Sequence, residues 1–462
     1  MLSFVSLGII IQIVSFILAF ARIKILSDSF SVADYGLISI YFSVISFISI
    51  LVIFNTDRFI FRTAAENGKY ARVATKKLFV LPFFFGPLSI IYFYIDPKFS
   101  YFAYIAMANV TIIGAFHLLR FYFLGIGMTK TYLVSSFLMT NLWFLILLFI
   151  LYFRDKMSVI NTFEIMLLSH VFLLIIGAIA FIKTPKLPHP DLPRIELSAA
   201  IKYSAGFLPI IISSRILELG DKYIVNSLMS SREMGLLIMG NSVLACVIAL
   251  LSVLSDIFRP YMNSFADDLS IHQINKYFFS LGLIGVYVAC LIFFSYGDII
   301  FKNVISDAYF ESCMIAKKLL PGTLISFLIL YFINILERER NSRRIAIAYT
   351  IGSLIYLPIT FVLVYLMGIN GAIMASYISN AAIVLLLGMY HWKYFFELIR
   401  PLIALTMTGL FSIVLVINMD EFSRGLLVAL GTLLASFLAF NLLHKTSRII
   451  SALKGGVNGF NN

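Results

Sequence analysis

Long apolar runs recur along the whole 462-residue chain, and they constrain its fold more than any other feature of the sequence. Each run covers roughly 17–25 residues, the length that an α-helix needs to cross about 30 Å of hydrocarbon. The runs lack the period-2 alternation that strands of a lipid-exposed barrel require, so we interpret them as helices. With 61% of its residues apolar and 13% charged, the chain has too few polar residues to cover a soluble fold. The sequence predicts an all-α polytopic membrane protein.

The runs predict about 14 transmembrane helices. Their starts lie near Leu2, Gly36, Leu78, Tyr101, Tyr132, Ile160, Tyr203, Gly235, Tyr277, Leu319, Ile345, Asn370, Ile399 and Gly425. Loops after even-numbered spans, together with the C-terminal tail, hold about two thirds of the 35 Lys and Arg residues. Because positive residues collect in cytoplasmic loops, we expect both termini in the cytoplasm. The same bias explains the net charge of +12, so it indicates no nucleic-acid partner.

A proline-rich segment divides the chain. Residues 183–202 contain Pro185, Pro188, Pro190 and Pro193, which disfavour helix and favour an extended connector. We therefore predict an N-terminal six-helix lobe at 1–182, a cytoplasmic linker at 183–202 and a C-terminal six-helix lobe at 203–395. Two additional helices at 396–444 and a cytoplasmic tail at 445–462 complete the predicted architecture.

An internal repeat supports the two lobes. A shift of 199 residues places Ser31, Asp34, Gly36 and Asp57 on Ser230, Glu233, Gly235 and Asp256. Ser followed three residues later by Asp or Glu is a capping box, which satisfies backbone amides where a helix begins. With six spans in each half, the repeats run parallel, and transporters built from such repeats bind their substrate between the halves. The sequence thus predicts two pseudo-symmetric lobes around a central cavity.

Several short motifs, in order along nearly the whole chain, resemble one known family. They are Asp34-Tyr35-Gly36-Leu37, Asp221-Lys222-Tyr223-Ile224, Gly235-Leu236, Arg259-Pro260 and Gly368-Ile369-Asn370-Gly371-Ala372. The chain resembles the polysaccharide (O-antigen, Wzx-type) flippases of the multidrug/oligosaccharidyl-lipid/polysaccharide exporter superfamily. The resemblance implies that undecaprenyl-pyrophosphate-linked oligosaccharide repeat units cross the bacterial inner membrane for O-antigen or capsular polysaccharide assembly. It also implies a polysaccharide polymerase and a chain-length regulator as partners.

The seventh predicted span contains four charged residues: Arg215, Glu218, Asp221 and Lys222. Charge inside a span is costly and usually faces a cavity. At 100° per residue, Arg215, Glu218 and Lys222 share one face, while Asp221 stands off it. One hypothesis is that Arg215 contacts the pyrophosphate or the sugars as they cross. The other is that Arg215 and Glu218, as i,i+3 neighbours, merely neutralise each other.

Basic residues at both ends of the first two spans suit an anionic passenger, because a guanidinium matches phosphate oxygens with two parallel hydrogen bonds. Arg22 and Lys24 end the first span, on the predicted periplasmic side. Asp57, Arg58 and Arg62 end the second span, on the predicted cytoplasmic side. Ordinary cytoplasmic charge bias is the competing explanation for Arg58 and Arg62, and interfacial snorkelling is that for Arg22.

Three further positions are candidates for binding or gating. His117 and Arg120 are i,i+3 neighbours in the fourth span, and a histidine can couple transport to protons because its ordinary pKa lies near 6.5. The competing interpretation is a structural role, which is common for a single histidine near a helix end. Arg120 joins the predicted substrate-binding residues. Asp256 and Arg259, at the end of the eighth span, are a candidate lobe-closing pair. Glu218, Asp221, His117 and Asp57 complete the candidate coupling and gating residues.

No catalytic or cofactor site is predicted. The sequence contains no G-x-x-x-x-G-K-[ST] loop, no H-E-x-x-H motif and no Cys/His cluster with metal-ligand spacing. Cys246, Cys290 and Cys313 are therefore interpreted as packing residues. The energy for transport then has to come from an ion gradient of H⁺ or Na⁺, from the membrane potential or from removal of product.

Two other functions compete with a flippase. A multidrug/cation antiporter of the same superfamily would need acidic residues in its cavity, whereas the charges inside these spans are mixed to basic. A membrane polysaccharide polymerase usually places its catalytic groups on a sizeable extramembrane loop, and the loops here hold about 20 residues at most. Both observations favour the flippase.

Overall fold

The computed structural model describes residues 2–66, 68–95, 100–153, 157–184, 197–243, 245, 268–338 and 341–390. The chain divides into two compact units, Met1–Leu219 and Gly220–Asn462. Within the described ranges, every regular element is a helix. Most of the predicted linker, the two predicted C-terminal helices, Asp256 and Arg259 lie outside the described residues. The proposed lobe boundaries at 182 and 203 therefore stay a prediction.

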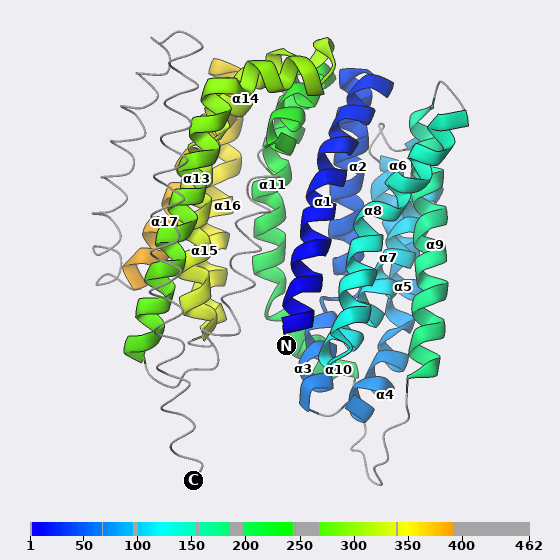
Figure 1. The fold of residues 1–462 in the computed structure, drawn as a ribbon. Coiled ribbons are helices and arrows are strands. Elements are labelled where there is room, and N and C mark those ends of the chain that lie inside the picture. The colour runs from blue at the N-terminus through cyan, green and yellow to red at the C-terminus, as the bar shows by residue number, and fades with distance from the viewer. Residues whose placement is uncertain are drawn as a thin grey trace. The chain divides into compact units, whose positions relative to one another are not determined.

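Unit 1 is a bundle of long helices with several short ones at one end (Figure 1). Its elements are α1 (Leu2–Ser29), α2 (Val32–Val52), α3 (Asp57–Glu66), α4 (Gly68–Leu78), α5 (Val80–Phe85), η1 (Gly86–Leu88), α6 (Ser89–Ile95), η2 (Ser100–Phe102), α7 (Ala103–Gly125), α8 (Thr129–Phe153), α9 (Val159–Lys183), α10 (Leu197–Ala205) and the first part of α11 (Leu208–Leu228).

Helix α7 lies at the centre of unit 1, where it packs against α2, α3, α8 and α9. Buried residues make up 61% of the apolar stretch of α7, against 22% for α8. A polar network ties the centre together: Asn109 donates to the Tyr41 hydroxyl at 3.2 Å and pairs with Nδ1 of His170 at 3.0 Å. Hydrogen bonds between membrane helices stabilise their association by about 0.6–2 kcal/mol each, so this network helps to fix α2, α7 and α9.

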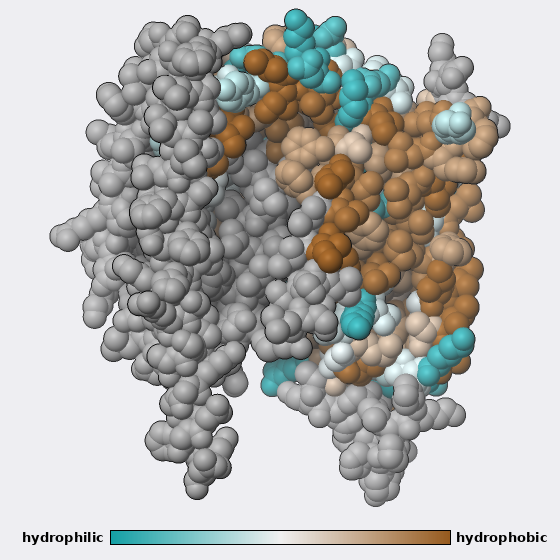
Figure 2. All heavy atoms as spheres, viewed as in Figure 1, coloured by the Kyte–Doolittle hydropathy of each residue, from teal (hydrophilic) through white to brown (hydrophobic). Residues whose placement is uncertain are grey.

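Helices α8 and α9 present large apolar side chains outward. Phe149 and Phe153 of α8 are 67% and 68% exposed, and Ile182 of α9 is 71% exposed. In Figure 2 the described surface over these two helices is mostly apolar, and polar residues gather toward its ends. Such a surface suits hydrocarbon and not water, as the sequence predicts for a membrane-spanning bundle.

The third predicted span, which begins near Leu78, is not one continuous helix. It consists of α5, η1 and α6. The apolar stretch begins earlier than predicted, at Tyr70, because the residues predicted as a loop form the helices α3 and α4. Pro82 and Pro87 explain the interruptions, because proline lacks the amide that continues a helix. At Gly86 an added Cβ would overlap the Thr111 hydroxyl of α7, so a glycine is needed where the interrupted span meets the central helix.

Unit 2 has fewer described helices. They are the last part of α11, the helical residues 231–243, α13 (Asp268–Val304), η3 (Asp307–Tyr309), α14 (Glu311–Leu319), α15 (Gly322–Arg338), α16 (Ser342–Met367) and α17 (Ile369–Tyr390). Helix α17 packs against α15 and α16, and α15 packs against α13. Gly368, with φ of 61°, makes the turn from α16 to α17, a left-handed conformation that favours glycine.

Eight stretches among the described residues are long and apolar enough to cross a membrane. They begin at Val32, Tyr70, Ser100, Thr129, Val159, Ile284, Arg343 and Ile369. The serine half of both predicted capping boxes is confirmed: Ser31 accepts the amide of Asp34 at 3.2 Å, and Ser230 accepts that of Glu233 at 3.4 Å. The chain is thus an all-α, multi-pass membrane protein.

Candidate functional site

The main candidate site is a buried polar cluster where the second span breaks between α2 and α3. Phe54 and Asn55, in the break, have φ angles of 51° and 54°. Residues with a side chain rarely adopt this left-handed region, and such strain costs about 1–3 kcal/mol per residue. Local bonds hold the break together, because the amides of Phe54 and Asn55 donate to the carbonyls of Leu51 and Ile50 at 2.8 and 3.0 Å.

The residues that follow the strained pair are polar and buried. Asn55, Thr56 and Asp57 are 2%, 0% and 4% exposed. The Thr56 hydroxyl donates to the Ile53 carbonyl at 2.7 Å. By contrast, Nδ2 of Asn55 and Oδ1 of Asp57 are buried with no hydrogen-bond partner among the described residues. Buried polar atoms usually have partners, so these two mark the break as more than a connector.

Arg120 of α7 brings a positive charge to this end of the bundle. Its guanidinium lies 5.4 Å from the ring centre of Phe121 and 5.6 Å from that of Tyr132, and it contacts the sulfur of Met139 at 3.4 Å. Nε of Arg120 is buried without a hydrogen-bond partner among the described residues. Aromatic faces attract a cation, but they leave the donors of the guanidinium fork available to an anion.

His117 lies one turn before Arg120 on the same face of α7. It is 8% exposed, and its Nδ1 is buried without a partner among the described residues. Arg120, His170 and Arg215 are all within electrostatic range of the imidazole, and Arg120 is likewise within range of Asp57. The cluster therefore combines a carboxylate, an imidazole and a guanidinium. Chemically, each of the first two can gain or lose a proton, and the third can bind an anion.

Arg215 and Glu218 of α11 form an ion pair. The side chains are 25% and 44% exposed, so the pair lies partly open. This is the ion pair expected of i,i+3 neighbours, so the guanidinium of Arg215 already has the Glu218 carboxylate as a partner. Any phosphate that Arg215 binds would have to share its guanidinium with Glu218 or displace Glu218.

The two basic residues at the end of α1 differ in their surroundings. Arg22 contacts the Thr140 carbonyl at 3.5 Å and lies 5.9 Å from the ring centre of Trp143, so it attaches α1 to α8. Lys24 pairs with Asp28 at 3.0 Å, one helical turn further on, and both side chains are more than 40% exposed.

Arg58 and Arg62 of α3 are both exposed. Nη1 of Arg62 lies 3.4 Å from the Tyr203 hydroxyl, and its guanidinium lies 5.4 Å from the centre of that ring. Arg62 thereby connects α3 to α10. Neither arginine shares the burial of Asp57, although all three belong to the same helix.

In unit 2, Asp221 is 8% exposed and its carboxylate accepts the amide of Lys222 at 2.8 Å. Tyr356 of α16 lies close to Asp221, and the Lys222 side chain is half-buried. The sequence predicts that Asp221 stands off the charged face of its helix, as a residue at the membrane interface. Its burial corrects that prediction and places Asp221 among the buried polar groups of unit 2.

Sequence reasoning missed Asn55 and Asn109. An asparagine within or at the end of an apolar span is the signal that could have found them, because an amide in hydrocarbon needs a partner. Among the described residues, no group of three or more His, Cys, Asp or Glu side chains could hold a metal ion.

No protein-family model matches the sequence, and no curated protein matches it. Solved structures do match. One is the lipid II flippase MurJ in an inward closed conformation, with a TM-score of 0.67 and 15% identity over 95% of this chain and 99% of that one. This chain therefore has the fold of this flippase, which solved transporters of the MOP superfamily share.

Two further structures carry that name. An inward-facing multidrug resistance MATE family transporter of the MOP superfamily has a TM-score of 0.62 and 12% identity over 84% of this chain and 95% of that one. A MOP superfamily transporter from Pyrococcus furiosus has a TM-score of 0.60 and 12% identity over 85% and 94%. For that protein, the reverse polarity of the binding pocket suggests a different function.

Proposed function

We propose that this chain is a secondary transporter that flips lipid-linked oligosaccharide repeat units from the cytoplasmic to the periplasmic leaflet by alternating access. The passenger would be an undecaprenyl-pyrophosphate-linked unit for O-antigen or capsular polysaccharide assembly, in a bacterial inner membrane, with both termini cytoplasmic. The observation that carries the proposal is the set of arginines on the span helices of unit 1: Arg22 on α1, Arg120 on α7 and Arg215 on α11. Flippase MurJ, which shares the fold, supports a lipid-linked passenger.

Arg120 is the strongest of these candidates for contact with the pyrophosphate. Its charge is held between aromatic rings and a thioether, and no carboxylate forms an ion pair with it in the described part of the chain. Arg215 is the second candidate, and its pairing with Glu218 suits a residue that exchanges one anionic partner for another. We assign Arg22, Lys24, Arg58, Arg62 and Lys222 to steering of the passenger at the two mouths.

Coupling would use the acidic and imidazole groups. Asp57 and His117 are buried close to Arg120, so a proton gained or lost there changes the field at the proposed anion site. In unit 2, Asp221 is also a buried carboxylate. A proton or a sodium ion fits this role. Asp256 and Arg259 keep the lobe-closing role that the sequence suggests.

A multidrug/cation antiporter is the second candidate, and the observation that favours it is burial of the carboxylates Asp57 and Asp221. Such a transporter holds a cation on a carboxylate and needs no arginine in its cavity. The two functions therefore differ in which sign of charge is essential. A polysaccharide polymerase is less well supported, because the matching structures are transporters and flippases.

The deciding experiment uses a deletion strain of the source organism. It measures surface polysaccharide together with the leaflet in which lipid-linked repeat units accumulate. Single units that accumulate on the cytoplasmic face support the flippase. Units that reach the periplasm without being polymerised favour the polymerase, and normal polysaccharide in the deletion strain favours the antiporter.

Complementation then tests the site. We expect Arg215→Ala to abolish export at normal protein levels, whereas Lys76→Ala, which removes an exposed lysine of α4, leaves it intact. Wild-type surface glycan in the Arg215→Ala strain would remove Arg215 from the binding site.

A further inference from the structure

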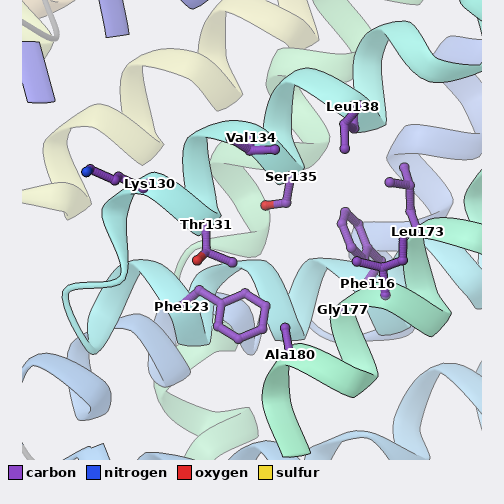
Figure 3. A pocket seen from close by; sticks show the side chains of 11 residues that line it. Phe116, Phe123, Lys130, Thr131, Val134, Ser135, Leu138, Leu173, Gly177 and Ala180 are labelled. Carbon is purple, nitrogen blue, oxygen red and sulfur yellow. The ribbon is translucent and has the colours of Figure 1, made fainter. Parts of the chain in front are cut away.

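A pocket of about 320 Å³ lies in unit 1 between α7, α8 and α9 (Figure 3). This volume is at the lower end of the range for small-molecule pockets, roughly 300–1,000 Å³. Its walls are mostly apolar, with two hydroxyl groups and one lysine. The lining residues are Phe116, Phe123, Lys130, Thr131, Val134, Ser135, Leu138, Leu173, Ile176, Gly177 and Ala180.

The pocket opens on the outward face of the bundle. Val134 and Ile176, on its rim, are 46% and 43% exposed, and they belong to the two helices whose outer surfaces are apolar. The floor is buried: Phe116 and Leu173 are 3% and 2% exposed. Helix α9 reaches the floor through Gly177, where an added Cβ would lie 3.1 Å from the Phe116 ring. An occupant that enters from this face comes from hydrocarbon, and an apolar lipid chain fits such walls.

One end of the pocket is positively charged. Lys130 stands in the first turn of α8, which contains no acidic residue, and its side chain is exposed. In Figure 3 the lysine lies at one end of the lining, beyond Thr131 and Ser135. The Ser135 hydroxyl donates to the Tyr132 carbonyl of its own helix at 2.9 Å. A second basic residue, Lys183, stands in the last turn of α9, the neighbouring wall of the pocket, and it is also exposed.

We infer that this groove binds an anionic glycerophospholipid. One acyl chain occupies the apolar pocket, and the phosphate of the headgroup lies at the start of α8 beside Lys130. Charge complementarity decides the class of lipid, because a lysine at the membrane surface attracts anionic headgroups and has no such attraction for zwitterionic ones. The site is separate from the polar break between α2 and α3, and it does not depend on the proposed passenger.

The test compares two lipids that differ only in the headgroup. Delipidated full-length protein in detergent is titrated with palmitoyl-oleoyl phosphatidylglycerol or with palmitoyl-oleoyl phosphatidylethanolamine, and bound lipid is counted by native mass spectrometry. We expect tighter binding of phosphatidylglycerol. Lys130→Gln should lower this affinity about fivefold and leave phosphatidylethanolamine unchanged, since one lysine near the surface contributes about that factor. Lys302→Gln, at an exposed lysine of α13, is the matched control.

A second variant tests the pocket itself. Ser135→Phe places a ring in the groove and should lower occupancy by both lipids, whereas Thr140→Phe, at an exposed position of α8 outside the pocket, should not. Equal binding of the two lipids, or a preference that survives Lys130→Gln, would overturn the assignment. Tighter binding of undecaprenyl phosphate than of phosphatidylglycerol in a competition experiment would also overturn it, because the occupant would then be an isoprenoid. Lys130 is exposed, so the first variant is expected to fold normally.

Discussion

The polar break between α2 and α3 leads to a quantitative prediction about Asp57 and Arg120. Both groups are charged in water, both lie at the same end of unit 1, and the structure places them within electrostatic range of each other. Neither forms a direct ion pair with the other among the described residues, so the two charges interact across a gap. Removing one charge should therefore change what the other contributes to the free energy of unfolding.

The size of the effect follows from the geometry. Two unit charges 4 Å apart, near a protein surface, interact by about 4 kcal/mol, and this is the upper limit for a pair that makes no direct contact. Neighbouring residues in one network usually show coupling energies of about 0.5–3 kcal/mol. We expect about 1–3 kcal/mol between Asp57 and Arg120. Each single variant leaves a buried charge uncompensated, whereas the double variant Asp57→Asn/Arg120→Met leaves none.

The assay is thermal unfolding of the four proteins of this cycle in one detergent at one heating rate. In a unit of about 220 residues, 1 kcal/mol corresponds to roughly 2–4 °C in Tm. The double variant should be more stable than the sum of the two single losses predicts, by about 4–8 °C for a coupling of about 2 kcal/mol. Met suits position 120 because the guanidinium is surrounded by Phe121, Tyr132 and the sulfur of Met139.

The exposed pair Lys24–Asp28 supplies the control cycle. Its side chains are 43% and 45% exposed, and exposed ion pairs contribute about 0–1 kcal/mol because water screens them. Losses at Asp57 and Arg120 that add to within about 0.5 kcal/mol would show that the two groups are independent, and the idea of one polar cluster would then be wrong.

Two further predictions concern unit 2. An added Cβ at Gly371 would overlap the backbone carbonyl of Leu363. Gly371→Ala should therefore destabilise the protein by about 3 kcal/mol or more, which a lower Tm would show. Gly206→Ala is the control and should change Tm little, because its Cβ would make an ordinary 3.5 Å contact. Burial and the hydrogen bond to Asp298 raise the pKa of the Cys313 thiol to about 12. The test uses a protein whose other cysteines are replaced by serine. Because the thiolate is the nucleophile, Cys313 should react with iodoacetamide at pH 8 at least about a hundredfold more slowly in the folded protein than in the denatured chain. Equal rates in the two states would contradict the burial of Cys313.

Much of the fold could be predicted from the sequence, because hydrocarbon imposes simple rules. The length of an apolar run specifies a span, and the Ser31 and Ser230 boxes specify where two helices begin, so these features follow from local chemistry alone. The Arg215–Glu218 pair was one of two interpretations of the seventh span, and it forms because i,i+3 neighbours share a helix face. These features depend on neighbours in sequence.

The break at Phe54 could not be predicted in the same way. No glycine or proline marks it, and a positive φ is uncommon for a phenylalanine, whose ring here packs against that of Phe85 of α5. Asn55 is the one local hint, because asparagine tolerates the left-handed region. The partners of Arg120 were equally hidden: Tyr132 and Met139 belong to the next helix, and only the packing of α8 on α7 brings them to the guanidinium.

The two proposed functions can be separated by charge at this one site. Four buried polar atoms there, on Asn55, Asp57, His117 and Arg120, have no protein partner among the described residues. Such an atom costs about 1–3 kcal/mol unless another group satisfies it, and a passenger or a proton is such a group. A flippase for an anionic lipid needs the guanidinium, so Arg120→Met should abolish transport while Arg120→Lys retains part of it. A cation antiporter needs the carboxylate, so Asp57→Asn should abolish transport while Arg120→Met does not. If both substitutions leave transport at the wild-type level, the break is purely structural, and neither mechanism acts through it.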